Sequence, residues 1–159
     1  MIKTAVGLVI TGAIASAWFM PTLSFGGGDD ERYENVDKTF VRDAKKEVVI
    51  DTGKKKMYYD STPSKRMHFY AAWDYCKTMD FDGYTDSRVP SKREMVSLLE
   101  LSRRSVTVKH AFKNILEERY WSATDDRFDK AWYFDFDLGR YSTQDYKYKY
   151  RTLCVRDEK

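Results

Sequence analysis

The sequence contains little cysteine, histidine, glycine or proline, and it has no large excess of either charge. Its 159 residues include two Cys, two His, eight Gly and three Pro. The low Gly and Pro numbers exclude collagen-like and Pro-rich low-complexity proteins. A zinc finger would need all four Cys and His residues, and their spacing does not fit one. The 28 Lys and Arg are balanced by 25 Asp and Glu, so the net charge of +3 does not favour a nucleic-acid partner.

Aromatic residues are the abundant class, because 12 Tyr, 9 Phe and 4 Trp make up 16% of the chain. With 42% hydrophobic and 33% charged residues, the composition is typical of a folded chain rather than a disordered one. The length suits one domain. We expect six aromatic side chains to lie in its core: Phe69, Trp73, Trp121, Trp132, Phe134 and Phe136.

The first 25 residues form a predicted export segment. Lys3 is their only charge, and the apolar run that follows contains an A-x-A cleavage motif at 15–17. This pattern is typical of a secretory signal peptide. The run continues to Phe25, about the length that spans a bilayer, so an uncleaved membrane anchor is the alternative. Both interpretations place the rest of the chain in the periplasm or on the cell surface, and only the second attaches it to a membrane.

Residues 26–39 are predicted to be a flexible linker, because three glycines precede a polar, mostly acidic stretch. Residues 40–159 then form one domain. This domain contains both cysteines, Cys76 and Cys154, and an even number in an exported chain predicts a disulfide. Two separate buried thiols are the alternative, and a catalytic thiol lacks an evident base partner.

The first half of the domain shows both strand and helix patterns. Short strands are predicted at 47–51 and 56–60, joined by a hairpin loop. Apolar residues at helical spacing predict a helix over 66–79. A second helix begins with a capping box formed by Ser91 and Glu94, and it should end near Ser102.

The end of the chain is predicted to be rich in strands. Alternation over 132–138 is typical of a half-buried strand, and a turn begins at Gly139. A second alternation over 146–155 predicts another strand, with Tyr on one face and Lys or Arg on the other. Helices in the first half and strands at both ends indicate the α+β class.

Four motifs together resemble one known family. They are HFYAAWDYC at 68–76, GYTDSRVPSKREMVSLL at 83–99, YWSAT at 120–124, and AWYFDFDLG to YRTLCVR at 131–156. In this order and with these gaps they are similar to the Lcl C-terminal domain family. The resemblance implies a C-type-lectin-like fold, with two helices packed on a twisted antiparallel sheet. It also implies a disulfide between Cys76 and Cys154, and an extracytoplasmic binding module.

The predicted last strand and one upstream Arg pair supply the candidate ligand-binding residues. They are Lys147, Lys149, Arg151, Tyr146, Tyr148, Tyr150, Arg103 and Arg104. Basic side chains suit sulfated glycans or acidic lipids, and the family's namesake binds sulfated glycans. Tyr adds apolar area with a polar tip. Ordinary surface charge and a second buried sheet face are the alternatives.

The best-matched motifs supply residues that we expect to be structural: Asp86, Arg88, Pro90, Ser91, Glu94, Trp121 and Ser122. Arg88 should pair with Asp86 or with backbone carbonyls, and Ser122 should bond to the backbone in a turn. The carboxylates from Asp125 to Asp137 indicate a solvated acidic loop, because the calcium motifs of EF-hands and C-type lectins are absent. We expect no metal and no cofactor.

These patterns predict a non-catalytic binding module that recognises a glycan, a polyanion or an envelope protein. The alternative is a structural subunit of an envelope assembly, held by its N-terminal segment. We do not expect an enzyme, because the sequence shows no Ser-His-Asp order and no metal-ligand set. The sequence indicates no oligomeric state.

Overall fold

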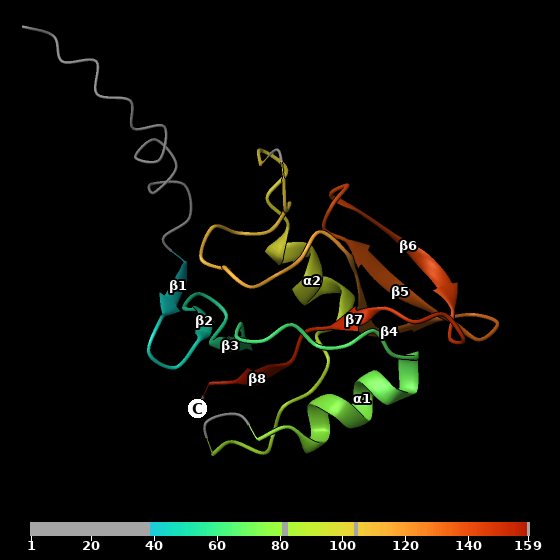
Figure 1. The fold of residues 1–159 in the computed structure, drawn as a ribbon, viewed down its shortest axis with the longest axis horizontal. Helices are drawn as coiled ribbons and strands as arrows, with labels where there is room; N and C mark the ends of the chain where they lie inside the picture. The colour runs from blue at the N-terminus through green and yellow to red at the C-terminus, as the bar shows by residue number, and fades with distance from the viewer. Residues whose placement is uncertain (1–38, 81–82, 104, 159) are drawn as a thin grey trace, which may run out of the picture. The chain divides into compact units, whose positions relative to one another are not determined.

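The computed structural model describes residues 39–80, 83–103 and 105–158, whose arrangement is shown in Figure 1. The predicted export segment and linker lie outside these ranges, except for Thr39. The described residues form two helices and eight strands. These are β1 (Phe40–Asp43), β2 (Val48–Asp51), β3 (Lys56–Tyr59), α1 (Phe69–Thr78), α2 (Lys92–Leu98), β4 (Arg119–Asp126), β5 (Lys130–Asp135), β6 (Arg140–Asp145), β7 (Arg151–Thr152) and β8 (Val155–Asp157). This content confirms the α+β class.

The strands form two sheets of four. The first has the order β1-β2-β3-β8 and is antiparallel throughout. The second has the order β6-β5-β4-β7, and its pairs are antiparallel except β4 with β7. The predicted hairpin is confirmed as β2 paired with β3, with Val48 opposite Tyr59. Both helices contact β4, so the second sheet carries the helices (Figure 1).

Two main clusters of buried side chains form the core. The larger joins both sheets to α2 and includes Tyr58, Met95 and Phe134. The second lies beneath α1 and is centred on Phe69 and Trp121, whose rings pack edge to face at 5.7 Å. Burial of aromatic side chains of this size contributes strongly to stability. The second cluster also supports the surface residues described below.

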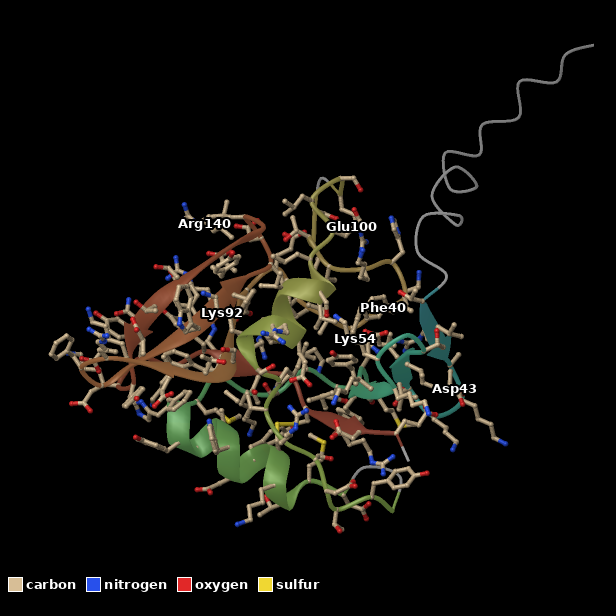
Figure 2. All side chains as sticks on the ribbon, turned by 180° about the vertical axis from the view of Figure 1, so that it is seen from behind. Phe40, Asp43, Lys54, Lys92, Glu100 and Arg140 are labelled. Carbon is tan, nitrogen blue, oxygen red and sulfur yellow. A yellow bond between two sulfur atoms is a disulfide. The ribbon has the colours of Figure 1, made fainter. Side chains whose placement is uncertain are left out.

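The predicted disulfide between Cys76 and Cys154 is confirmed, with a Cα–Cα distance of 5.3 Å (Figure 2). It ties α1 to Cys154, one of the two residues that separate β7 from β8. Both cysteines are buried within the second cluster. The bond therefore fastens the helix to the C-terminal strands from inside the core.

Both helices are shorter than predicted, because residues at one end of each form backbone β-bridges with other segments instead. The first was expected from residue 66, but Met67 pairs with Tyr150 as extended backbone and the helix begins at Phe69. The second ends at Leu98, because Leu99 pairs with Val108. Helical spacing does not reveal such backbone pairing.

The prediction for the aromatic core is only partly correct. Phe69, Trp121, Phe134 and Phe136 are buried. Trp73 is 48% exposed on α1, where its ring packs edge to face against that of Phe69 with ring centres 6.0 Å apart. Trp132 is half-buried, and the Nζ of Lys92 lies 3.1 Å from the centre of its ring (Figure 2).

Candidate functional site

The predicted strand over 146–155 is wrong. Strand β6 occupies Arg140–Asp145, where a turn was expected, and β7 consists of Arg151 and Thr152 alone. Between them the chain turns, since the amide of Tyr148 donates to the carbonyl of Asp145 at 3.1 Å. Tyr and Lys alternate with the period of a strand, but backbone hydrogen bonds to other segments hold this part of the chain in a turn.

The three tyrosines of this segment therefore have different environments. Tyr146 stacks on Phe69 with ring centres 4.7 Å apart. Tyr148 is 46% exposed, whereas Tyr150 is buried between Trp121 and Tyr133. Of the three, only Tyr146 and Tyr148 reach the surface, so these tyrosines do not share one face of a strand as expected.

The predicted basic residues separate in the same way. Arg151 pairs with Glu118 at 2.9 Å and donates to the carbonyl of Ser64, which makes it a structural residue. Arg103 donates to the carbonyl of Val108 at 2.9 Å. Lys147 pairs with Asp145 and stays exposed, and Lys149 is exposed. Arg104 lies outside the described residues.

Lys149 lines a groove of about 330 Å³ at the start of β4. The groove collects charged residues from four segments, together with one aliphatic and one aromatic side chain. They are Arg66, Glu117, Glu118, Arg119, Asp135, Asp137, Leu138, Lys149 and Tyr150. Sequence analysis placed Lys149 and Tyr150 among the candidates but missed Arg119, which carried no signal beyond its own charge.

Cations lie on the outside of this groove, and some of its carboxylates lie beneath them. Arg66 pairs with Glu118 at 2.6 Å, and the Arg66 side chain is 62% exposed whereas that of Glu118 is 21% exposed. Arg119 pairs with Asp135 at 3.1 Å in the same way, with 44% and 6% exposed. Hydrogen bonds from Arg151 and Arg66 lower the pKa of Glu118, so this carboxylate stays ionised. The outer edges of both guanidinium groups can therefore contact a ligand.

A second surface, which we call the aromatic end, lies where α1 begins. It consists of Tyr70, Trp73, Phe128, Tyr146 and Tyr148, which are exposed except for the half-buried Tyr146. Tyr70 packs against Tyr146 at 5.2 Å. The amide of Tyr146 donates to the carbonyl of Asp129 at 3.0 Å, which brings in the loop that carries Phe128. Phe128 was not predicted, although an aromatic residue in a polar loop is a recognisable signal.

The family-motif residues bond to one another and to the backbone, in part with the expected partners. Arg88 donates to the backbone carbonyl of Val89 at 3.4 Å, as one of its two expected interactions, but it does not pair with Asp86. It binds both carboxylate oxygens of Glu94, at 2.8 and 2.7 Å, whereas Asp86 pairs with Arg156 at 2.8 Å. The capping box of Ser91 and Glu94 is confirmed. Glu94 therefore serves the helix cap and Arg88 simultaneously.

The other motif residues join α2 to the second sheet. The carbonyl of Pro90 accepts from the amide of Ala123 at 2.6 Å. Trp121 is fully buried, and its indole donates to the carbonyl of Met67 at 2.9 Å. Ser122 lies in β4 rather than in a turn, and its hydroxyl accepts from the amide of Thr124 at 3.3 Å.

Stability should depend on the ionisation of Glu94. Burial alone would raise the pKa of Glu94, but hydrogen bonds from Arg88 and Ser91 outweigh it and lower the pKa from 4.5 to about 2. A lowered pKa stabilises the fold above pH 4.5, by ~3 kcal/mol, and this contribution disappears as the pH falls towards 2. In urea unfolding, we expect Glu94→Gln to be destabilised at pH 7 and to approach the parent below pH 3.

The exposed Glu117→Gln is the control for this measurement and should change stability little at either pH. A Glu94→Gln defect of the same size at pH 7 and at pH 2.5 would contradict the assignment.

In residues 39–80, 83–103 and 105–158, no group of three or more His, Cys, Asp or Glu side chains is placed to hold a metal ion. Neither helix in them is long and apolar enough to cross a membrane.

The fold and the motif cluster define a small, disulfide-tied α+β domain whose charged groove and aromatic end both involve the second sheet. The model of the Lcl C-terminal domain matches residues 36–156. The chain therefore belongs to this family, as the four motifs predicted. No curated protein matches the chain.

Proposed function

We propose that this domain is a non-catalytic, extracytoplasmic binding module with a C-type-lectin-like fold, and that its charged groove recognises an anionic glycan. The observation that carries the proposal is the arrangement of Arg66, Arg119 and Lys149 at the groove surface. Export follows from the predicted N-terminal segment, and a buried disulfide suits an oxidising compartment.

The groove offers an acidic sugar chain three cations at its surface, Arg66, Arg119 and Lys149, beside four carboxylates, two of which are already paired with the arginines. Guanidinium groups bind sulfate or carboxylate with two parallel hydrogen bonds. The exposed carboxylates of Glu117 and Asp137 can accept hydrogen bonds from sugar hydroxyls. Because both partners of the two ion pairs are already fixed by the fold, binding costs little side-chain entropy.

Retention on immobilised heparin tests this function. We expect the wild type to be retained and to elute as salt rises, because the contacts are ionic. Lys149→Ala should weaken binding roughly two- to fivefold, which corresponds to the free energy that one exposed ion pair contributes. Lys45→Ala is the matched control, since Lys45 is an exposed lysine in the loop between β1 and β2. Equal losses in both variants, or no retention of the wild type, would contradict the proposal.

A structural subunit of an envelope assembly is the second candidate function. The aromatic end favours it, because exposed Trp, Tyr and Phe side chains are typical of surfaces that bind other proteins.

A further inference from the structure

Phe128 combines two features that are unfavourable for an isolated domain. Its side chain is 89% exposed, the largest fraction among the exposed large hydrophobic residues of the described chain. Its φ is +61°, in the left-handed region that side chains other than glycine rarely adopt. This backbone conformation is strained for a bulky residue, and exposure of the ring returns no burial energy to offset the strain.

The loop that holds Phe128 is short and well anchored. Asp126 pairs with Lys130 across the ends of β4 and β5, so only residues 127–129 connect the strands. Asp129 also has a positive φ of 57°. Tyr146 binds the carbonyl of Asp129, which fixes the loop to the neighbouring turn. The ring of Phe128 is therefore held outward by a braced backbone.

Other aromatic side chains are exposed on the two segments that the Phe128 loop meets through the bond between Tyr146 and Asp129. Tyr70 is 63% exposed at the start of α1, and Trp73 and Tyr148 are each about half exposed. Beneath them, Phe69 stacks on Tyr146 and packs against Trp121. The aromatic end is thus supported by rings of the packed core, whereas its outer rings contact solvent. A rigid aromatic surface of this kind resembles the centre of a protein–protein interface.

The charges around the aromatic end identify the kind of partner. Exposed residues of both signs flank Phe128, with Asp126 and Asp129 beside Arg127 and Lys130. The two carboxylates cancel the two cations, so these residues offer no net attraction to an anionic bilayer or to a sulfated glycan. A rim of mixed charge suits another protein, whose surface supplies both signs.

We propose that the aromatic end is a docking surface for a partner protein, and that Phe128 is its anchor. The partner presents an apolar pocket that receives the Phe128 ring, surrounded by charges of both signs. This surface is separate from the glycan groove, and neither proposal depends on the other.

Two glycine variants separate docking from folding. Phe128→Gly and Asp129→Gly each relieve one positive φ, so both should raise the melting temperature by roughly 2–5 °C. Only Phe128→Gly removes the anchor. A lower melting temperature in Phe128→Gly would show that the ring supports the fold instead, and would overturn the proposal.

Docking is measured by photocrosslinking of the full chain in the cells that naturally produce it. Benzoylphenylalanine at position 128 should give one discrete protein adduct, and at the exposed Val96 of α2 it should give none. Excess unlabelled chain carrying Asp129→Gly should suppress the adduct. Chain carrying Phe128→Gly should compete on the order of 30-fold less well, the loss expected at an interface hot spot.

Four results would overturn the proposal: equal competition by both variants, equal labelling from Val96, an adduct with lipid or with a second copy of the chain, or no adduct. Heparin retention should be unchanged in Phe128→Gly. The two proposals can therefore fail independently.

Discussion

Replacing both Cys76 and Cys154 with alanine is expected to lower the free energy of unfolding by about 4 kcal/mol. The disulfide joins residues 78 positions apart, and a cross-link of this span removes much conformational entropy from the unfolded chain. Small domains have total stabilities of only about 5–15 kcal/mol, so this loss is a large fraction of the whole. Urea unfolding of the double variant at neutral pH, beside the oxidised wild type, measures it.

The reduced wild type is the control for the cysteine variant. It keeps both sulfur atoms in the second core cluster, so any difference from the double alanine variant reports packing alone. We expect the two to unfold at similar, lower urea concentrations than the oxidised protein. An unchanged midpoint after reduction would show that the bond contributes nothing to stability.

Trp121→Ala should destabilise the domain by about 3–5 kcal/mol, the range for removing a fully buried large aromatic residue. Trp121 is 0% exposed, and it contacts Phe69 on one side and Tyr150 on the other. It therefore supports the aromatic end through Phe69 and the groove through Tyr150. Thermal and urea unfolding give the stability, and the heparin and crosslinking assays show whether both surfaces weaken together.

Trp121→Phe distinguishes the ring from its hydrogen bond. Phenylalanine keeps most of the apolar volume but removes the indole hydrogen bond to the carbonyl of Met67, which still accepts from the amide of Tyr150. We expect an intermediate loss, because one hydrogen bond contributes roughly 0.5–1.5 kcal/mol. Trp132→Phe is the surface control, since Trp132 is half-buried and stacks on Lys92. A larger loss at position 132 than at position 121 would contradict this account of the core.

Local patterns in the sequence were sufficient to predict the features that depend on residues close together in the chain. The hairpin of β2 and β3 follows from two short apolar runs and a turn. The capping box depends on two residues three positions apart, and it formed as predicted. The four motifs identified the family, and that family relationship implied the pairing of Cys76 with Cys154.

Features that depend on distant segments could not be obtained in this way. The Tyr and Lys alternation after residue 145 has a period of two, but Tyr150 pairs with Met67 and Tyr146 with Asp129. Arg88 pairs with both carboxylate oxygens of Glu94 and not with Asp86, which is closer in the sequence. Sequence spacing contains no information on which of several acceptors the fold brings within reach.

The sequence by itself thus determined the family, the α+β class and the cysteines available for a disulfide. Tertiary structure alone decided which charged and aromatic side chains reach the surface together. In the folded domain Tyr150 is buried, Arg151 pairs with Glu118, and Phe128 is exposed on a loop where its φ is positive. The reason is that helix caps and hairpin turns are made by residues close in the chain, whereas a groove or a docking surface is assembled from segments that only packing brings together.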